Sequence, residues 1–389
     1  MKRDISSELI NRLDIERVSR LLEVPEHRIA GAIQRRTLQY VFSPPELFRF
    51  DKPISGIEGG TSIFLEPFDI VRGFPKIRRT LVLYPGVVSH FSSCEKVIVE
   101  EKMNGYNARV ALIGDRITGI TRGGFVCPYT TEKADELVNR EFFLDHPDLV
   151  LCGEMVGPDS PYVPKTIYDI ESLEFFVFDI MEKITGKPMP VMRRRALMDE
   201  YGIRSVRLFG EYDVDEAHIE ITKIIKGLGS LQHEGVVIKD PQMQVQPVKY
   251  TSSQSNCADL RYAFEFYNDY GRDFFFPRVC REAFQSVEWD EDEESIAQRC
   301  QRLGESIILP MIKTIKKKEE GERITETVQI RVRDLRTVEN FEEHLRLLGV
   351  DAIFERPEKI GNEYLVKIRK LFKSTNDKTE SILRGELWS

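Results

Sequence analysis

Apolar residues recur at helical intervals near the beginning of the chain. Between residues 6 and 36 they follow the spacing of an amphipathic helix, interrupted once by Pro25. Between Tyr40 and Pro67 the pattern becomes irregular, and short apolar runs alternate with Gly and Pro, which favours strands and loops. We therefore predict a small N-terminal module that begins with helices and continues into strands.

A different pattern extends from about Thr80 to Lys249. Short runs of β-branched and aromatic residues recur there, separated by turns and by helical stretches such as residues 131–140. These runs are LVLYPGVV, VIVEEK, ARVALI, LVLCGEMV, LEFFVFDIM and GVVIK. Strands with intervening helices predict an α+β domain.

The pattern becomes helical again after Thr251. Residues 258–285 are aromatic and helix-compatible, and after an acidic run the apolar positions from Ile296 to Ile315 follow helical spacing. The mixed-charge segment 316–323 is typical of a helix end or a linker. Beyond it, TVQIRVRDL alternates like a strand, VENFEEHLRLLG is helix-like, and two further short runs complete a compact α/β tail.

The length of 389 residues agrees with two or three domains, because one domain averages about 150 residues. With 41% hydrophobic and 31% charged residues, the composition excludes disordered, collagen-like and disulfide-scaffold proteins. The shifts in pattern predict four parts: an N-terminal module (1–70), an α+β domain (71–252), a helical segment (253–320) and an α/β domain (321–389).

The formal net charge is −8, from 56 Lys and Arg against 64 Asp and Glu. Such a chain does not hold nucleic acid by bulk attraction, so any contact with a polynucleotide must be local. The six cysteines are scattered without a C-x-x-C pair, which predicts reduced thiols and neither a zinc site nor disulfides. The sequence shows no signal peptide and no apolar run of about 18 residues, so we expect a cytoplasmic protein without a membrane partner.

The segment with the most chemical information runs from Val99 to Asn107. It is strand-like and breaks at a Lys-x-Asn-Gly turn, which places Lys102 at a strand end. A lysine attacks phosphorus only as the free amine, and burial or nearby cations lower its pKa from about 10.4 toward neutrality. An isolated tetrapeptide of this kind is more often an ordinary turn with a solvated lysine. A nucleophilic role for Lys102 therefore requires partners elsewhere in the chain.

Five further segments follow this turn in order. They are Thr121–Gly124, Gly153–Gly157, Phe176–Ile180, Glu234–Lys239 and Val248–Tyr250. With Lys102–Gly105 they resemble the ordered motifs of the covalent nucleotidyltransferase superfamily, which contains RNA ligases, DNA ligases and mRNA capping enzymes. Each segment alone is weak, but each occurs once and lies at the edge of a predicted strand. Order and spacing together support the resemblance.

The resemblance implies a role for each charged residue. Lys102 is the nucleophile that attacks the α-phosphate of a nucleotide, and Lys239 and Lys249 neutralise the charge that develops on that phosphate. As nearby cations, these two lysines would also depress the pKa of Lys102. Glu154 and Glu234 are the acidic partners, one at the ribose and the other near the lysine or a metal ion, for which we choose Glu234. The alternatives are solvated strand-end lysines and structural salt bridges.

The same motifs imply further contacts with the nucleotide. The implied cofactor-binding residues are Glu100, Asn104, Gly105, Arg122, Glu154, Phe178, Glu234, Lys239 and Lys249. Strand alternation places Phe176 and Phe178 on one face and Asp179 on the other, and we assign purine stacking to Phe178 and core packing to Phe176. Upstream, residues 71–79 carry four basic side chains, which predicts contact with a triphosphate tail or an RNA 5′ end, with a solvated basic loop as the equal alternative.

The layout narrows the resemblance further. DNA ligases usually carry Lys-x-Asp-Gly and, like capping enzymes, continue into an OB-fold, whereas residues 253–320 here are helix-compatible. Asn104, the N-terminal module, the helical segment and the tail together are similar to the archaeal, homodimeric, ATP-dependent RNA ligases. The implied fold is α+β, with ATP-grasp-like antiparallel sheets in the nucleotidyltransferase domain.

This resemblance implies ATP and Mg²⁺ or Mn²⁺ as cofactors. It implies RNA with 5′-phosphate and 3′-hydroxyl ends as substrate, joined through a lysyl-AMP intermediate and an adenylylated RNA end, with circularisation of single molecules included. It also implies a homodimer formed through residues 253–315, for which packing within one chain is the alternative. Other open functions are a DNA ligase, another polynucleotide nucleotidyltransferase, or a dimeric RNA-binding protein with an inactive ligase-like domain.

Overall fold

The computed structural model describes residues 11–42 and 44–387. The N-terminal part contains two helices that cover a four-stranded antiparallel sheet in sequential order, β1-β2-β3-β4. The elements are α2 (Ile15–Leu22), α3 (Glu26–Gln34), β1 (Leu38–Val41), β2 (Leu47–Phe50), β3 (Ser62–Phe64) and β4 (Asp69–Val71). Leu9 and Ile10, which begin the predicted helical pattern, lie outside the described residues.

The central part contains two sheets, ordered β10-β9-β7-β8 and β11-β6-β12-β13-β5. Every pair is antiparallel except β13 and β5. The strands are β5 (Arg78–Arg79), β6 (Lys96–Lys102), β7 (Tyr106–Ile113), β8 (Arg116–Thr121), β9 (Leu149–Val156), β10 (Glu174–Glu182), β11 (Leu208–Asp213), β12 (Gly235–Lys239) and β13 (Val248–Thr251). The predicted α+β class with antiparallel sheets is confirmed. Because β6 and β7 belong to different sheets, the chain crosses between the sheets at the turn that follows Lys102.

Five helices accompany these sheets. They are α4 (Leu83–His90), α5 (Pro128–Leu137), α6 (Arg140–Asp145), α7 (Val191–Glu200) and α8 (Ala217–Ser230). The run LVLYPGVV was grouped with the strand-like segments, and this prediction is wrong because most of it forms α4. Pro85 occupies the first turn of this helix, where its missing N–H has no helical partner to lose, and Leu83 and Val87 enter the core shared with β6 and α8.

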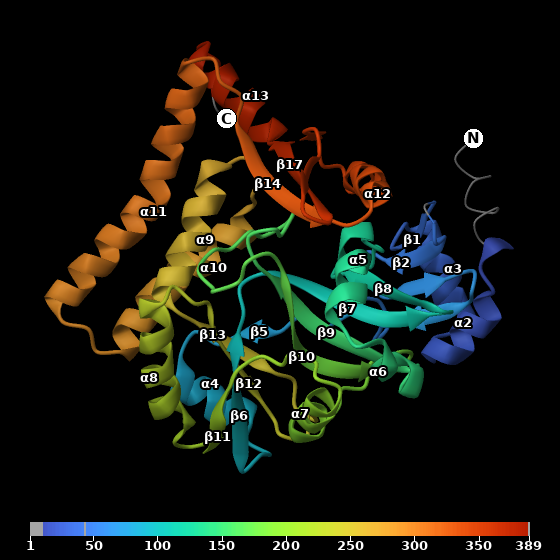
Figure 1. Ribbon diagram of the computed structural model, residues 1–389. Helices are drawn as coiled ribbons and strands as arrows, with labels where there is room; N and C mark the ends of the chain where they lie inside the picture. The colour runs from blue at the N-terminus through green and yellow to red at the C-terminus, as the bar shows by residue number, and fades with distance from the viewer. Residues whose placement is uncertain (1–10, 43, 388–389) are drawn as a thin grey trace.

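Three helices follow the central sheets: α9 (Ser253–Glu265), α10 (Arg272–Glu288) and α11 (Glu293–Glu319). The acidic run leads into α11, whose first turn is capped by the Asp292 carboxylate. The buried positions of α11 are Arg299, Ser306, Pro310 and Thr314, and the Arg299 guanidinium forms an ion pair of 2.6 Å with Glu282 of α10. Polar contacts therefore contribute to holding α11 to its neighbours, and the helix lies along an edge of the molecule (Figure 1). Its apolar residues Ile296, Ile308, Leu309 and Ile312 are exposed, whereas Leu303, Ile307, Met311 and Ile315 are half-buried.

The C-terminal part is a small α/β unit whose sheet has the order β14-β17-β15, with β16 also paired to β17. Its elements are β14 (Thr325–Val332), α12 (Leu335–Leu347), β15 (Ala352–Phe354), β16 (Glu358–Ile360), β17 (Glu363–Leu371) and α13 (Lys373–Leu383). Phe341 and Leu345 of α12 join the apolar core beneath α5 and the first central sheet. The tail is thus packed against the central part (Figure 1). Within the described ranges, no helix has the length and apolarity needed to cross a membrane.

Candidate active site

A cavity of about 840 Å³ lies beside the point where the chain crosses between the two central sheets. It is bounded by β6, β12 and β13 of one sheet, by β9 and β10 of the other, by the loop before β5 and by α10. Eight of the residues predicted from the sequence line it: Glu100, Lys102, Gly105, Arg122, Glu154, Phe178, Lys239 and Lys249. The structure thus gathers side chains that are up to 149 residues apart in the sequence, from Glu100 to Lys249.

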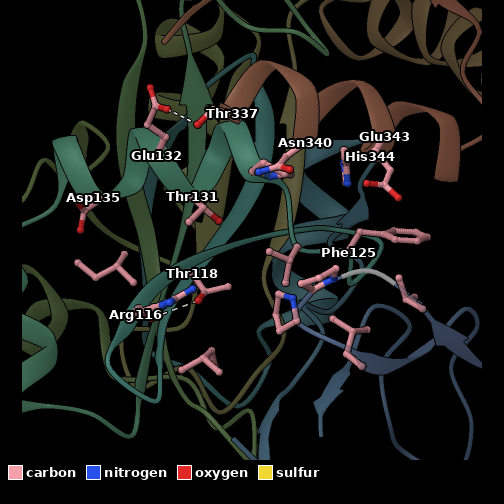
Figure 2. A pocket seen from close by; sticks show the side chains of 18 of the residues that line it. Arg116, Thr118, Phe125, Thr131, Glu132, Asp135, Thr337, Asn340, Glu343 and His344 are labelled. Carbon is pink, nitrogen blue, oxygen red and sulfur yellow. Dashed lines mark hydrogen bonds between the residues drawn. The ribbon is translucent and has the colours of Figure 1, made fainter. Parts of the chain in front are cut away.

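A second cavity of about 910 Å³ lies between the N-terminal sheet, α5 and α12 (Figure 2). It contains none of the predicted site residues. Glu132 accepts a hydrogen bond from Thr337 across this cavity, and burial lowers the pKa of His344 to about 4, so the imidazole is neutral at physiological pH (Figure 2). The concentration of lysines and carboxylates identifies the cavity beside Lys102 as the candidate active site.

Lys102 is paired with a carboxylate. Its Nζ donates to Glu234 Oε2 at 2.8 Å and also lies 3.4 Å from the carbonyl oxygen of Met103. Burial acts to lower the pKa of Lys102, but the carboxylates of Glu234 and Glu154 outweigh it and raise the pKa above its ordinary value. The expectation that neighbouring cations depress the pKa of Lys102 is therefore wrong.

Glu154 faces the same amine from β9. Burial raises the pKa of its carboxyl to about 7, although Lys102 acts in the opposite direction, and Glu234 adds to the rise. The backbone N–H of Gly105 also acts to lower the pKa of this carboxyl. A Cβ at Gly105 would lie 2.2 Å from the carbonyl oxygen of Met155, so only glycine allows the turn to approach β9 this closely.

The lysine whose proton is easily lost is Lys249. Burial and the nearby cations Lys102, Arg79 and Arg122 lower its pKa to about 8, against the opposing effect of Glu234. Among the described residues its ammonium has no hydrogen bond or ion pair. An unpaired ammonium on a half-buried side chain that faces a cavity is suited to an anionic ligand.

The positive charge of Lys239, by contrast, is balanced by acidic side chains. Its side chain is 1% exposed, and Nζ lies 2.8 Å from Asp179 Oδ1, 3.0 Å from Glu100 Oε2 and 2.6 Å from the carbonyl oxygen of Phe178. Glu100 is fully buried and also pairs with Arg194 and Arg195. Burial acts to raise the pKa of Glu100, but Lys239 and Arg194 lower it overall. The structure therefore places Lys239 and Glu100 in one ion network at the wall of the cavity.

The aromatic-Asp strand departs from simple alternation. A β-bulge between Val177 and Asp179 shifts the register against β9. As a result Asp179 pairs with Lys239 and does not point away from the site, which corrects the expectation for this residue. Phe178 lines the cavity with its ring 5.2 Å from that of Phe74, whereas Phe176 does not line it. Both Phe176 and Phe178 pack against the cluster that contains Met103 and Val206.

Arg122 is exposed at the rim of the cavity, on a turn held by the N-terminal part. Arg49 Nη1 donates to the carbonyl of Gly123 at 3.0 Å, and Ser62 Oγ donates to the carbonyl of Gly124 at 2.9 Å. Gly60 has φ +84°, and a Cβ there would lie 2.1 Å from the carbonyl oxygen of Arg122. The N-terminal part therefore sets the position of the turn that carries Arg122.

The four basic side chains of residues 71–79 point in different directions. Lys76, Arg78 and Arg79 line the cavity, while Arg72 turns away to an ion pair of 3.2 Å with Glu58. Burial and the nearby Arg278 lower the pKa of Arg79. Arg278 belongs to α10, so the helical segment also contributes to this wall, which the sequence did not indicate.

Asn104 and Glu234 complete the site without lining the cavity. The backbone N–H of Asn104 donates to the hydroxyl of Tyr168 at 2.9 Å. His233, beside Glu234, contacts Glu101 Oε1 through Nδ1 at 2.7 Å. Tyr168 and the contact of His233 with Glu101 were not predicted from the sequence. The position of His233 directly before Glu234 was a possible signal, whereas Tyr168 lies in an irregular loop without any motif.

The carboxylates near Lys102 are too few to enclose a metal ion by themselves. Mg²⁺ prefers carboxylate, phosphate and water oxygens. In residues 11–42 and 44–387, no group of three or more His, Cys, Asp or Glu side chains is gathered as a metal cage. The carboxylates of Glu234 and Glu154 near Lys102 provide oxygen atoms of the kind that Mg²⁺ prefers.

Comparison with known proteins agrees with this geometry. Residues 95–251 match the family described as RNA ligase, and residues 262–386 match the C-terminal region of the ligase Pab1020. An archaeal ATP-dependent RNA ligase, solved in two forms, is 44% identical with a TM-score of 0.91, and the match covers 97% of this chain and 100% of that one. A "Putative ATP-dependent DNA ligase from Aquifex aeolicus" is 25% identical with a TM-score of 0.87, over 94% of this chain and 100% of that one.

A sequence relative extends the comparison. An uncharacterised protein of Methanocaldococcus jannaschii is 38% identical, over 97% of this chain and 98% of its own length. The first family match ends just before α9 and the second begins within this helix, so that together they extend over most of the central, helical and C-terminal parts. The resemblance found in the motifs is thereby confirmed, and the chain belongs to the RNA ligase family as an enzyme of the archaeal ATP-dependent type.

Proposed function

We propose that this enzyme joins RNA 5′-phosphate and 3′-hydroxyl ends through an AMP group bound covalently to Lys102. The observation that carries the proposal is the position of the Lys102 amine, held 2.8 Å from Glu234 beside a cavity that also presents Lys249 and Glu154. A nucleophile within hydrogen-bond reach of a base is the arrangement that covalent catalysis requires.

In the first step, the lone pair of Lys102 Nζ attacks the α-phosphorus of ATP. A P–N bond forms, the bond from the α-phosphorus to the bridging oxygen breaks, and pyrophosphate leaves. The raised pKa of Lys102 means that the resting amine is protonated, so a proton must first be removed. Glu234 Oε2 already accepts the N–H of this amine and is the atom placed to take that proton.

Lys249 is the cation best placed to neutralise the charge on the phosphate. Its ammonium has no partner among the described side chains, whereas Lys239 is balanced by Glu100 and Asp179. We therefore assign phosphate neutralisation mainly to Lys249 and the orientation of the site wall to Lys239. Arg122 at the rim supplies a guanidinium suited to phosphate oxygens.

Two further transfers complete the proposal. AMP passes from Lys102 to the RNA 5′-phosphate, and the 3′-hydroxyl then displaces AMP to form the phosphodiester bond. Lys76, Arg78 and Arg79 line the cavity and form a local basic patch on a chain of net charge −8. Such a patch supports recognition of a phosphorylated end and does not require bulk attraction.

The nucleotide and metal belong to the same proposal. Phe74 and Phe178 both line the cavity, and we assign stacking on adenine to Phe178. Glu234, with Glu154, would hold Mg²⁺ or Mn²⁺, which when bound neutralises phosphate charge. Glu100, Asn104 and Gly105 act mainly by shaping the wall and the turn, since Glu100 is paired within the protein and Asn104 lies outside the cavity.

We also propose that the enzyme is a homodimer joined through the helical segment. Several large apolar side chains are exposed on α10 and α11: Phe276, Val279, Phe284, Val287, Ile296, Ile308, Leu309 and Ile312. A soluble chain rarely leaves this much apolar surface uncovered, and a second copy would cover it. The fully buried positions of α11 are mostly polar, and its half-buried apolar residues Leu303, Ile307, Met311 and Ile315 pack within the chain, so the exposed residues Ile308, Leu309 and Ile312 are the ones that a second copy would cover.

RNA is the preferred substrate over DNA because the more similar structure is an archaeal RNA ligase, at 44% identity against 25% for the Aquifex protein. Circularisation of single-stranded RNA is included in the proposal. All six cysteines are free, which supports a reducing, cytoplasmic location. An inactive RNA-binding domain is disfavoured by the intact set of Lys102, Glu154, Glu234 and Lys249 at one cavity.

The deciding experiment is incubation with α-labelled ATP and Mg²⁺ followed by denaturing electrophoresis. The native enzyme should acquire an acid-labile, alkali-stable label, and Lys102→Ala should acquire none. Lys96→Ala is the matched control, because Lys96 begins the same strand and is exposed. Labelled GTP tests capping chemistry, and 5′-phosphorylated RNA compared with nicked DNA tests the substrate. Labelling of Lys102→Ala at the native level would overturn the proposal.

A further inference from the structure

Residues 157–172 form a loop between β9 and β10, here called the bridging loop, that contacts two distant parts of the molecule. On one side the hydroxyl of Tyr168 accepts the backbone N–H of Asn104 at 2.9 Å. On the other side Gln329 Nε2 donates to Asp159 Oδ1 at 2.6 Å and Arg331 Nε donates to Asp159 Oδ2 at 3.1 Å. Gln329 and Arg331 belong to β14, which lies next to this loop (Figure 1). The loop therefore connects the C-terminal part with the turn that carries the nucleophile.

Asp159 ties the two ends of the bridging loop together. Its side chain is fully buried and accepts a hydrogen bond of 2.5 Å from Ser172 Oγ, and its backbone N–H donates to the carbonyl of Ser172 at 3.1 Å. A Cβ at Gly157 would lie 2.1 Å from the same carbonyl oxygen. Because both ends are fixed at Asp159, a displacement of this carboxylate moves the whole loop.

Helix α12 supplies a second contact from the C-terminal part. His344 Nε2 lies 2.9 Å from the hydroxyl of Tyr162, and the Tyr162 ring packs against Phe341. Burial lowers the pKa of His344 to about 4, so this contact keeps its neutral form throughout the physiological range. The bridging loop is consequently held by both β14 and α12.

On the active-site side, Tyr168 contacts the surroundings of Lys102 in three ways. Its hydroxyl fixes the Asn104 amide, and its side chain packs against Met103. Its ring also lies 4.6 Å from the imidazole of His233, which contacts Glu101. The residues on both sides of Lys102 are thus restrained through one tyrosine.

We propose that Tyr168 is a positioning residue for Lys102, and that the C-terminal part serves the chemistry by holding Tyr168 in place through Asp159. This inference rests on the proposed adenylylation of Lys102. It gives the C-terminal part a role in the first step that does not require contact with ATP or RNA. The hydroxyl of Tyr168 acts on the rate of the chemical step, because it fixes the backbone on which the attacking amine is carried.

The test compares single-turnover adenylylation of Tyr168→Phe and Gln329→Ala at saturating ATP. Tyr168→Phe keeps the ring and removes the hydroxyl, and Gln329→Ala removes one hydrogen bond to Asp159. We expect the rate constant to fall by about 10- to 100-fold in Tyr168→Phe and by a smaller factor in Gln329→Ala. The labelled amplitude and the KM for ATP should stay near the native values. Thr327→Ala is the matched control, since Thr327 is exposed on the same strand two residues from Gln329.

The amplitude separates positioning from simple loss of folding. A lower amplitude at an unchanged rate constant would mean that the substitutions only unfold part of the protein, and it would overturn the inference. A native rate constant in Tyr168→Phe would overturn it as well. A double variant should lose less rate than the product of the two single losses, because both substitutions act along one connection.

Hydrogen exchange of the peptide that contains Lys102–Tyr106 tests the connection without any chemistry. Exchange at Asn104 should become faster in both variants and remain native in Thr327→Ala. If the native enzyme formed no lysine adduct but this exchange responded as expected, the proposed function would fail and the structural connection would stand. If the native adduct formed and neither rate nor exchange responded, only the present inference would fail.

Discussion

The ammonium of Lys102 donates a 2.8 Å hydrogen bond to the carboxylate of Glu234, which comes 132 residues later in the chain. This pair connects the end of β6 with the residue before β12, two neighbouring strands of one sheet. Glu234 raises the pKa of Lys102 and at the same time offers an acceptor for its proton. The pair therefore favours the protonated form of Lys102, and the attack proposed for this amine requires that the proton be removed first.

Replacing Glu234 with Gln should change the pH–rate profile of adenylylation in two ways: the pH at which the rate rises, and the maximum rate. The adenylylation rate of the native enzyme should rise with pH toward the raised pKa of Lys102, because only the free amine attacks. In Glu234→Gln this rising limb should shift to lower pH, since an anion that stabilises the ammonium is lost. The plateau rate should nevertheless fall by about 10²-fold or more, because the proton acceptor is gone. A pH–rate profile of single-turnover labelling measures both effects, and an unshifted limb would contradict the assignment.

Lys249 should lose its affinity for the nucleotide as its proton leaves. Its pKa of about 8 means that the free enzyme carries the charge below pH 8 and loses it above. We expect ATP binding by the native enzyme to weaken as the pH rises through this value. Binding by Lys249→Arg should be independent of pH over the same range, because arginine remains charged. Equilibrium titration with a non-hydrolysable ATP analogue distinguishes the two proteins, and equal pH dependence would contradict the role.

The partly buried charge of Lys249 should lower the free energy of unfolding of the native protein. A pKa below the ordinary value means that the folded protein disfavours this proton. The penalty is complete below pH 8 and disappears as the pH rises toward 10.5. Lys249→Met should therefore increase the free energy of unfolding by about 1–3 kcal/mol at neutral pH and by little above pH 10. Denaturant titrations at two pH values check this, with Lys96→Met as the control. A destabilised Lys249→Met would show that the ammonium has a structural partner.

Substitution of Arg79 tests whether the basic segment 71–79 binds ATP or the RNA end, and we expect it to leave the fold intact. In the described structure its side chain has no hydrogen bond or ion pair, and its strand is held by backbone pairing to Val248 and Lys249. Arg79→Gln should keep the native melting temperature but raise the KM for ATP or for the RNA end by about 10-fold. Assays of adenylylation alone and of RNA adenylylation separate the two ligands. Arg346→Gln, an exposed change on α12, should alter neither step.

The residues that could be predicted from the sequence share a physical feature. Lys102, Glu154, Phe178, Glu234 and Lys249 lie on or next to strands, where local pattern and motif order carry information about position. The turn after Lys102 was identifiable because a Lys-x-Asn-Gly tetrapeptide favours a turn, and Gly105 is indeed the residue that permits close approach to Met155.

The parts that escaped prediction depend on long-range packing. The ion network around Lys239 was not predicted, because its partners Asp179 and Glu100 come from two different sheets and a bulge shifts the register of the strand that carries Asp179. The helix α4 replaced an expected strand because β-branched residues at Val87 and Val88 pack equally well against α8. Tyr168 and Arg278 lie in a loop and in a helix whose contacts with the site are created only by tertiary structure.

The association of two chains should depend on the exposed face of α10 and α11. Val287 is 82% exposed and Ile308 is 53% exposed, so a charge at either position has little effect on the isolated chain. Val287→Asp combined with Ile308→Asp should convert a dimer to a monomer, because two buried charges at an interface cost several kcal/mol. Sedimentation at micromolar concentration measures this, with Leu347→Asp on α12 as the control. A monomeric native protein would remove the dimer from the proposal.

The contact between the N-terminal part and the turn of Arg122 leads to the last prediction. Gly60 has φ +84°, and a Cβ at this position would lie 2.1 Å from the backbone oxygen of Arg122. Because that atom is backbone, Gly60→Ala must displace the turn, whereas Gly56→Ala, at φ +79° with open space around it, introduces a similar strain without this clash. We expect both variants to lose about 1 kcal/mol of stability from backbone strain, and Gly60→Ala to lose in addition at least 10-fold in ligation rate. Ligation of 5′-phosphorylated RNA by the two variants, each measured well below its melting temperature, isolates the displacement of Arg122 from the strain. Equal ligation rates would show that the position of this turn does not limit the reaction.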